Sequence, residues 1–276
     1  MSSLKLFALL AVAALAAGCA QNNANPTPAT TTGTSPTPAT TTGTPPTSPT
    51  SNGLTSITVG TEAAYPPFED TQTDGKIVGF DIDVMTEIGN RSGFTPHFQN
   101  AQFQAIIPSI QSGQFDAGIS AFTITDERKQ QVSFSVSYYD NELMVAVLAA
   151  NTDIAKPTDL EGKKVCTQTG TTSEDWLRAN VNATNDTLTL LDAFPPCADA
   201  LKRGDVQAMM IDRAVVRDLI AKSNGEMKQA FVIPTDEQFG IAVAKTNAAL
   251  LTRLNTALVA MKQDGTLDRL KDKWSV

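Results

Sequence analysis

The sequence predicts an α/β fold with mainly parallel sheets, divided into two lobes. From Leu54 onward, short runs of β-branched or other apolar residues alternate with amphipathic helical stretches, a pattern typical of strands joined by crossover helices. About 220 residues carry this alternation, which is more than a typical single domain needs. Of the 276 residues, 41% are apolar, which is enough to build a sizeable core.

The first half of this region predicts three strands, two helices and an apolar run. The strands are expected at 56–60, 115–120 and 132–136, and the apolar run at 143–148. A helix at 81–92 would end at Gly93 and a helix at 105–112 at Gly113, because glycine readily adopts the conformation that closes a helix. Pro108 is compatible with the second helix only near its first turn.

The second half predicts three further strands and four helices. The strands are expected at 164–167, 206–211 and 239–244. The helices are expected at 173–180, 197–203, 214–222 and 247–261. These elements continue the alternation and would supply the second lobe and the return of the chain to the first.

The N-terminus, residues 1–19, has the pattern of an export signal. Lys5 is its only charged residue, and an apolar run at 6–17 is too short to span a bilayer. The run ends in Leu-Ala-Ala-Gly-Cys, which resembles a bacterial lipoprotein signal whose cysteine, here Cys19, becomes the lipidated first residue. The alternative is ordinary signal peptidase cleavage after Ala16, which would leave Cys19 as a free thiol.

Residues 20–53 predict a disordered tether. They contain no charged residue, seven prolines and twelve threonines, and a ten-residue repeat at 27–36 returns almost unchanged at 37–46. Such a segment has no apolar surface to bury and stays extended. A signal, a lipid site and a tether together describe a protein held at a membrane and working outside the cytoplasm, on the periplasmic or extracellular side.

Composition argues against several classes of function. The 21 basic and 29 acidic residues give a net charge of −8, so no basic surplus is present to neutralise nucleic acid phosphates. Three cysteines and a single histidine, His97, leave little for a zinc site. Gly-rich phosphate loops and nucleophile elbows are also missing from the sequence. We therefore expect a binding protein with no catalytic residues, no metal and no cofactor.

Two charged residues stand beyond the carboxyl ends of strands, where ligands bind in open α/β sheets. Asp212 precedes a helix, so it is either the helix N-cap or the partner of a ligand cation. Arg128 lies in the first turn of a helix capped by Thr125, where a cation opposes the helix dipole. It is either a solvated surface residue or a bidentate partner of a ligand carboxylate. The loop 169–172 leads into a helix N-terminus, which favours an anion.

Several spaced motifs resemble the extracellular solute-binding proteins of polar amino acid ABC importers (family 3). The most specific is Gly-Phe-Asp-Ile-Asp-Val at 79–84, preceded by Tyr-Pro-Pro-Phe at 65–68. Further matches lie at 119–128, 134–135, 138–139, 170–172, 204–208 and 264–274. The resemblance covers roughly residues 56–275, in the expected order.

The resemblance implies a clamp of the periplasmic-binding-protein type II class, with a hinge of two crossing strands near 143–148 and 238–244. Lobe 1 would comprise 54–144 with 240–276, and lobe 2 would comprise 145–239. A free L-amino acid would bind in the cleft, and the lobes would close on it. The implied partners are the permease subunits of an ABC importer and, through the lipid, the membrane; the protein itself is expected to be a monomer.

The resemblance also implies roles for residues that hold the ligand's α-groups. Arg128 would bind the α-carboxylate, with the backbone N–H groups of Thr123 and Thr172. Asp212 would pair with the α-ammonium, helped by the Thr123 hydroxyl and a carbonyl at Ser120 or Ala121. One charge would then come from each lobe, so that a zwitterion bridges the two.

The remaining implied residues surround the ligand side chain. Tyr65 and Phe103 would sandwich it, and Glu62, Phe68 and Gln168 would border its far end. Alternatively, Tyr65 and Phe103 are ordinary core aromatics and Glu62 is a solvated loop carboxylate. A carboxylate at the far end favours a basic amino acid, arginine or lysine. Glutamine is the next candidate, and glutamate is disfavoured because Glu62 would repel it.

Two other classes share this scaffold. Extracytoplasmic cyclohexadienyl dehydratases resemble the family, but their substrates lack the amino acid ammonium that Asp212 would bind. A sensory ligand-binding protein would need a separate signalling partner. Both remain alternatives to transport.

The three cysteines lie in two different regions of the sequence. Cys19 belongs to the signal boundary, whereas Cys166 and Cys197 both fall in the second lobe, 31 residues apart. Paired cysteines at these places resemble some relatives in the family, and export implies an oxidising compartment. We expect a disulfide between them; two buried free thiols are the alternative.

Overall fold

The protein is described by a computed structural model that covers residues 55–276. The predicted export signal at 1–19 with Cys19, the whole of the predicted tether at 20–53 and residue 54 of lobe 1 lie outside the described residues. Within the described residues, no helix combines the length and apolar character needed to cross a membrane.

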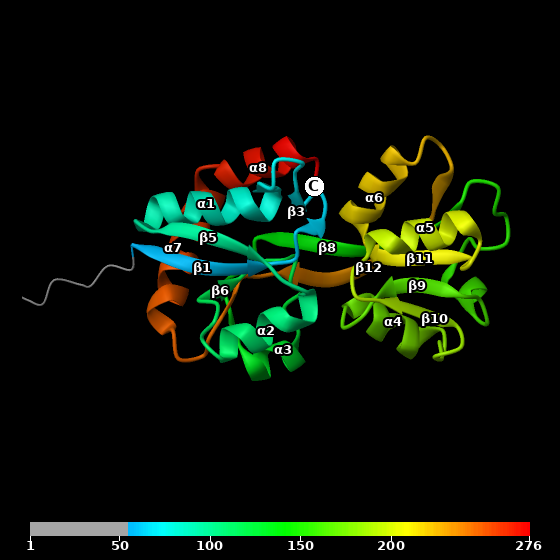
Figure 1. Ribbon diagram of the computed structural model, residues 1–276, viewed down its shortest axis with the longest axis horizontal. Coiled ribbons are helices and arrows are strands. Elements are labelled where there is room, and N and C mark those ends of the chain that lie inside the picture. Colours follow the sequence, from blue (N-terminus) through cyan, green and yellow to red (C-terminus); the bar gives the residue numbers. More distant parts are fainter. Residues whose placement is uncertain (1–54) are drawn as a thin grey trace, which may run out of the picture. The chain divides into compact units, whose positions relative to one another are not determined.

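Two five-stranded sheets organise these residues (Figure 1). The first sheet has the order β5-β1-β6-β13-β7. Its strands are β1 (Ser56–Thr61), β5 (Thr95–Asn100), β6 (Ala117–Gly118), β7 (Ser133–Phe134) and β13 (Ala242–Val243). Its helices are α1 (Phe80–Ser92), α2 (Phe103–Gln111), α3 (Asp126–Gln131), α7 (Ala248–Gln263) and α8 (Thr266–Trp274). A small antiparallel sheet, β2 (Ala64–Tyr65), β3 (Glu69–Thr71) and β4 (Ile77–Val78), accompanies it.

The second sheet has the order β10-β9-β11-β8-β12. Its strands are β8 (Tyr139–Leu148), β9 (Val165–Gln168), β10 (Leu188–Leu191), β11 (Ala208–Asp212) and β12 (Met227–Phe239). A 3-10 turn (Pro157–Leu160) and the helices α4 (Thr172–Asn180), α5 (Pro195–Arg203) and α6 (Arg213–Lys222) complete this lobe. In Figure 1, α5 and α6 lie on one side of the sheet and α4 on the other.

Each sheet is mixed, so the prediction of mainly parallel sheets is wrong, whereas the prediction of two α/β lobes is confirmed. Three neighbouring strands run parallel in each sheet, β5-β1-β6 in the first and β10-β9-β11 in the second. The other two are antiparallel to their neighbours. The reversed strands are β8, which runs from the first lobe into the second, and β13, which follows β12 back into the first.

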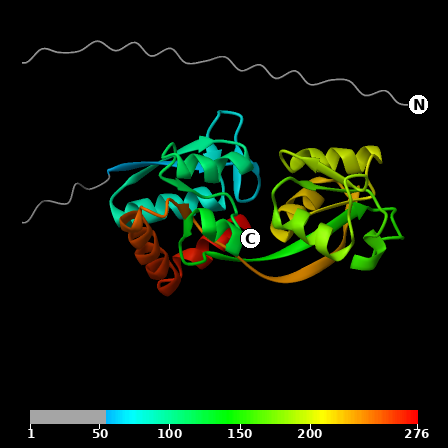
Figure 2. The same ribbon diagram turned by 90° about the horizontal axis from the view of Figure 1, so that it is seen from below.

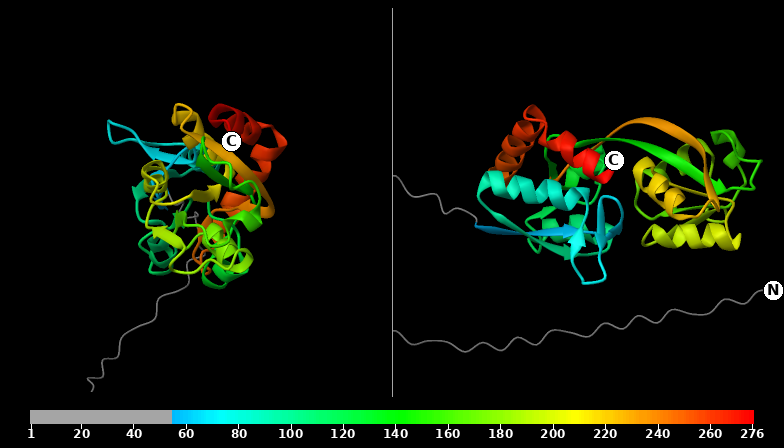
Figure 3. Two further views of the ribbon diagram at one scale, coloured as in Figure 1. Left: turned by 90° about the vertical axis from the view of Figure 1, so that its right-hand side faces the viewer. Right: turned by 90° about the horizontal axis from the view of Figure 1, so that it is seen from above.

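The long antiparallel pair β8–β12 connects the two lobes, as the two extended ribbons in Figures 2 and 3 show. The pairing runs from Tyr139 opposite Phe239 to Leu148 opposite Met227. Its register shifts between Ile233 and Glu237, next to the ladder position where Asn141 faces Glu237. The predicted crossing strands are therefore present, although both begin earlier in the chain than 143 and 238.

Most predicted elements appear with shifted ends. The helix expected at 105–112 begins at Phe103, so Pro108 lies inside α2 rather than in its first turn. The strand expected at 115–120 reduces to β6, and 239–244 divides between the end of β12 and β13. The strands β2 to β5 and β10, the helix α8 and most of β12 were not predicted. The edge strand β5 was missed because Pro96 and its polar residues obscure the alternation.

Cys166 on β9 and Cys197 on α5 form a disulfide, as predicted. Both are fully buried, and their Cα atoms lie 5.5 Å apart. The bond joins the middle of the second sheet to the helix packed on it, beneath the edge from which Gln168 and Asp212 project.

We predict that replacing both cysteines by alanine lowers the free energy of unfolding by about 3–4 kcal/mol, because a cross-link over 31 residues restricts the unfolded chain. Denaturant unfolding measures the change. Wild-type protein under reducing conditions should show the same loss, and an unchanged midpoint after reduction would contradict a stabilising role.

Candidate functional site

A pocket lies where the carboxyl ends of the parallel strands of both sheets meet. Its lining contains ten of the eleven residues that the sequence analysis selected, together with Thr171: Glu62, Tyr65, Phe103, Ser120, Ala121, Thr123, Arg128, Gln168, Thr171, Thr172 and Asp212. Glu62 directly follows β1, and Gln168 and Asp212 end β9 and β11. The site thus forms where open α/β sheets bind ligands.

Asp212 turns away from the helix it precedes. It occupies the N-cap position of α6, yet its side chain makes no capping hydrogen bond. Instead, it accepts hydrogen bonds from the Tyr65 hydroxyl and the Asn141 amide, both at 2.6 Å. Burial raises the pKa of Asp212 to about 7, against the lowering effect of the Tyr65 bond. The helix-capping interpretation is therefore wrong, and the carboxylate is directed into the cleft.

Arg128 is anchored at two points and keeps donors free. Thr125 caps α3 by accepting the Arg128 N–H at 3.2 Å, as predicted. The guanidinium donates to the Thr123 carbonyl at 2.9 Å and to the Gly170 carbonyl at 3.0 Å. Burial lowers its pKa. A guanidinium has five N–H donors, so donors remain for another acceptor.

Aromatic rings support the same guanidinium. It lies over Phe103 at 5.3 Å and over Phe122 at 5.7 Å, and the two rings stack with centroids 4.7 Å apart. Cation–π contacts fix its plane without occupying its donors. Within the described part of the chain, no carboxylate forms a salt bridge with Arg128. The solvated-surface interpretation of Arg128 is therefore wrong.

Glu62 is a buried carboxylate, not a solvated one. It is 5% exposed, and its backbone N–H donates to the Ser120 hydroxyl at 3.0 Å. Its Oε2 accepts a hydrogen bond from the Gln168 side chain of the other lobe at 2.6 Å. Burial raises the pKa of Glu62 to about 7, although the Gln168 bond lowers it. No basic side chain among residues 55–276 pairs with this carboxylate.

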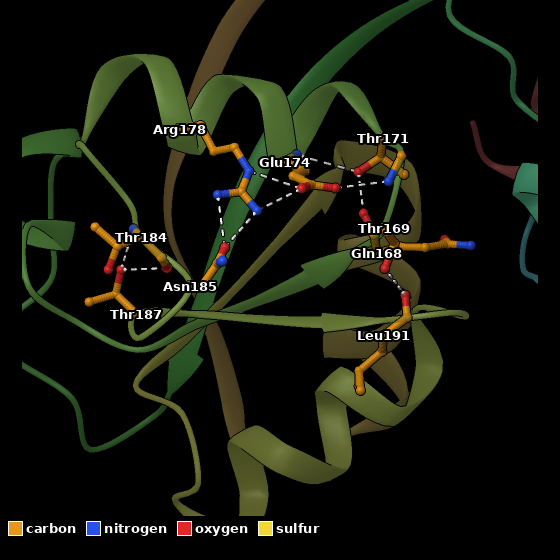
Figure 4. Close-up of polar contacts among 10 residues, drawn as sticks. Gln168, Thr169, Thr171, Glu174, Arg178, Thr184, Asn185, Thr187 and Leu191 are labelled. Carbon is orange, nitrogen blue, oxygen red and sulfur yellow. Dashed lines mark hydrogen bonds and ion pairs between the residues drawn. The ribbon is translucent and has the colours of Figure 1, made fainter. Parts of the chain in front are cut away.

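The loop between β9 and α4 is held by its own residues (Figure 4). The Thr171 hydroxyl donates to the Gln168 carbonyl at 2.7 Å and accepts the Glu174 N–H at 3.4 Å. The Glu174 side chain accepts the Gly170 N–H at 2.9 Å. Glu174 thus already occupies part of the expected anion site, which leaves the Thr172 end of the loop to face the pocket.

Of the three aromatic residues predicted to surround the ligand side chain, two line the pocket and one does not. Tyr65 and Phe103 line the pocket. Phe68 does not: it is fully buried and packs against Phe80, Tyr139 and Phe239 with ring centroids 5.3–6.1 Å apart. This cluster lies where β8 and β12 leave the first lobe, and Phe68 reaches the site only through its stacking on Tyr65.

Two residues of the crossing strands were missed by the sequence analysis. Asn141 on β8 donates to Asp212 and also to Glu237 on β12, the latter at 2.9 Å. The Thr123 hydroxyl lies 3.5 Å from the same Glu237 carboxylate. The available signal was a polar residue just before the apolar run at 143–148. Its contacts depend on the register of β8 against β12, which the sequence did not reveal.

The charges of the lining define what the pocket complements. Among the lining residues, Glu62 and Asp212 carry carboxyl groups and Arg128 carries a guanidinium group. Residues 55–276 contain no cluster of three or more His, Cys, Asp or Glu side chains that could hold a metal ion. The pocket therefore carries one uncompensated negative charge when both carboxyls are ionised.

A family model described as bacterial extracellular solute-binding proteins, family 3, matches residues 57–276. The chain is 37% identical to ABC transporter arginine-binding protein 1 of Escherichia coli (strain K12), over 79% of this chain and 90% of that protein. It is 32% identical to L-cystine-binding protein TcyJ of the same strain, over 79% and 82%. Arginine-binding extracellular protein ArtP of Bacillus subtilis (strain 168) is 32% identical, over 81% and 87%.

Solved structures show the same architecture. An ancestral arginine-binding protein bound to arginine is 38% identical and superposes with a TM-score of 0.77, over 81% of this chain and 99% of that one. A structure of an ancestral arginine-binding protein bound to glutamine gives 38% identity and a TM-score of 0.76, over 80% and 97%. The two-lobed fold predicted from the sequence and its family resemblance are both confirmed.

Proposed function

The chain belongs to family 3 of the bacterial extracellular solute-binding proteins, and we propose that it captures a basic L-amino acid, arginine or lysine, in its cleft and delivers it to the permease subunits of an ABC importer. The family consists of solute-binding proteins, so the prediction that the chain is not an enzyme is confirmed.

The observation that carries the proposal is the pair of buried carboxylates, Glu62 and Asp212, which have no cationic partner among the described residues. Each is held away from water, and burial raises the pKa of each to about 7. A ligand with two cationic groups and one carboxylate would neutralise both of them together with Arg128. Free arginine and lysine have this charge pattern.

In this proposal, Arg128 binds the α-carboxylate of the ligand and Asp212 binds its α-ammonium. The free donors of Arg128 suit a carboxylate, which a guanidinium binds in a bidentate manner. The backbone N–H groups of Thr123 and Thr172 would assist. Asp212 would bind the α-ammonium together with the Thr123 hydroxyl and a carbonyl at Ser120 or Ala121.

The ligand side chain would then extend between Tyr65 and Phe103 toward Glu62. Aromatic faces attract a guanidinium or ammonium group, and Glu62 would supply a charge-assisted hydrogen bond at its end. Gln168, which donates to Glu62 from the other lobe, would fix that carboxylate. Two of the relatives are named as arginine-binding proteins, which supports the same ligand class.

Closure of the cleft follows from where these groups originate. Arg128 and Glu62 belong to the first lobe and Asp212 to the second, so a ligand touching all three bridges the lobes. A ligand shifts an open–closed equilibrium only by its differential affinity for the two states. The bridging zwitterion would supply that difference through rotation about β8 and β12.

Glutamine is the second candidate. The ancestral structure bound to glutamine is as similar to this chain as the one bound to arginine. A carboxamide would donate to Glu62 as Gln168 does, but it would leave one negative charge uncompensated. We therefore rank it below the basic amino acids.

We also propose that the protein is anchored by a lipid on Cys19 and acts as a monomer outside the cell membrane. The lobes would comprise 54–144 with 240–276, and 145–239. The family description as extracellular supports the compartment, and the export pattern of residues 1–19 supports the anchor.

We predict that arginine and lysine raise the melting temperature in a thermal-shift screen of the twenty amino acids. Replacing Arg128 by alanine should weaken arginine binding at least roughly 100-fold, because a buried charge-assisted contact is lost. Arg203→Ala, which removes an exposed arginine paired with Asp205, is the control and should bind normally. A response to glutamate alone, or normal binding by Arg128→Ala, would contradict the proposal.

We predict that Tyr65→Phe weakens arginine binding roughly 10-fold at neutral pH. Asp212 must be ionised to pair with an ammonium group, and burial raises its pKa to about 7. Affinity should therefore fall as the pH drops through this range. Because the Tyr65 hydroxyl lowers the pKa of Asp212, its removal should raise that pKa and move the fall in affinity to higher pH. Calorimetry at several pH values measures this shift.

The matched control is Tyr139→Phe, because the Tyr139 ring packs against Phe68 and Phe239 outside the pocket lining. It should leave both the affinity and its pH dependence unchanged. An identical pH profile for wild type and Tyr65→Phe would show that the hydroxyl does not tune Asp212.

A further inference from the structure

A second pair of acidic side chains lies directly behind the pocket wall. Glu69 on β3 and Asp81 in the first turn of α1 are both fully buried. They lie close enough that each carboxyl group influences the pKa of the other. The ion pairs of residues 55–276 include neither of them. Two carboxyls in this arrangement cannot both ionise without a large cost.

The backbone forces the two groups together. Gly79, with φ of 148°, is the N-cap residue of α1, and a Cβ at this position would overlap the Phe68 carbonyl. The Asp81 N–H also donates to that carbonyl at 3.0 Å. This close approach of the glycine brings the first turn of α1 against β3, so Asp81 meets Glu69.

Two of the four carboxyl oxygens of the pair accept hydrogen bonds from neighbouring groups, and the other two have no donor. Asp81 Oδ2 accepts the Ala121 N–H at 2.8 Å and the Tyr138 hydroxyl at 2.9 Å. Glu69 Oε1 accepts the Ser120 hydroxyl at 2.7 Å. The other two oxygens, Glu69 Oε2 and Asp81 Oδ1, are buried without an N–H or O–H partner. A single proton between them would satisfy both.

The groups held by this pair belong to the pocket. Ser120 and Ala121 line it, and the Ser120 hydroxyl also accepts the Glu62 N–H at 3.0 Å. Ala121 has φ of 47°, a conformation that a residue with a Cβ adopts only when its surroundings impose it. Its bond to Asp81 is such a constraint.

We propose that Glu69 and Asp81 share one proton and act as positioning residues, which fix Ser120, Ala121 and the backbone of Glu62 against the ligand. Their effect on affinity rests on the proposed function, whereas the shared proton does not. Glu69 carries the proton, because Asp81 already receives two donors and these favour its ionised form.

The surroundings keep the proton in place. Burial, followed by the repulsion from Asp81, raises the pKa of Glu69 well above its ordinary value. Burial raises that of Asp81 to about 7. The other titratable groups facing the pair are Glu62, Tyr65 and Tyr138, and each of them is neutral or negative.

The shared proton makes the unfolding free energy depend on pH. The unfolded chain releases the Glu69 proton near 4.5, the ordinary value for glutamate, while the folded chain retains it. Because the folded state then binds more protons, the contribution of the pair is fully present below 4.5 and decreases as the pH rises toward the folded pKa.

Carboxamide variants test the sharing directly. In Glu69→Gln, the amide N–H would donate to Asp81 Oδ1 and the carbonyl would still accept from Ser120. In Asp81→Asn, the carbonyl would keep the Ala121 and Tyr138 bonds, and the amide would donate to Glu69 Oε2. Each single variant therefore supplies the one hydrogen. In the double variant both facing groups are amide NH₂ groups, so two donors meet without an acceptor. At least one of these hydrogen bonds must then be lost.

We predict that each single variant binds arginine within about 3-fold of wild type, while the double variant loses roughly 10- to 100-fold. Melting temperatures measured without ligand should show the same non-additivity. Glu69→Gln should also flatten the decline of melting temperature as the pH rises above 4.5, the ordinary pKa of glutamate. Glu87→Gln, which changes a half-buried glutamate of α1 paired with Arg91, is the control and should retain the decline.

The outcomes separate the proposals. Additive losses in the double variant, or a pH profile of Glu69→Gln equal to that of wild type, would overturn the shared proton. Non-additive melting temperatures with equal arginine affinities in all four proteins would overturn the positioning role. Non-additive melting temperatures in a wild-type protein that binds neither arginine nor lysine would instead overturn the proposed function and retain the shared proton.

Discussion

Two carboxylates, Glu62 and Asp212, are buried in the lining of one pocket without an ion-pair partner among the described residues, and the organisation of the site depends on this constraint. Burying a charge is costly unless it is paired. Uncharged donors, Gln168, Tyr65 and Asn141, moderate the cost but leave the charge uncompensated. A closed cleft is therefore favoured when a cationic ligand is inside it, which joins recognition to lobe movement.

The fold supplies these groups through a repeated construction. Both sheets have three parallel strands whose carboxyl ends face the pocket, and a pair of crossing strands joins them. Asn141 and Glu237 lie opposite each other on those strands, and the Asn141 amide donates to both Glu237 and Asp212. Asp212, the proposed partner of a ligand ammonium, is thus connected to the crossing strands by direct hydrogen bonds, while Glu69 and Asp81 hold Ser120 and Ala121 of the pocket lining.

The sequence predicted the alternation of strands and helices, and its motifs selected ten of the residues around the pocket. Asp212 was found because it is a charged residue at a strand end, where ligands bind, and Arg128 because a cation at a helix start opposes the helix dipole. The mixed strand directions, the burial of Phe68 and the roles of Asn141 and Glu69 were not found. All of these depend on how distant strands pair, and strand pairing leaves no local pattern in a single sequence.

The most direct test of this account compares arginine with citrulline, which has a similar shape but carries a neutral urea group in place of the guanidinium. Calorimetry on wild type and Glu62→Gln gives the ratio of the two dissociation constants in each protein. Charge complementarity at Glu62 predicts that wild type prefers arginine by roughly 100-fold and that the variant loses most of this preference. Equal affinities of wild type for the two ligands would contradict it.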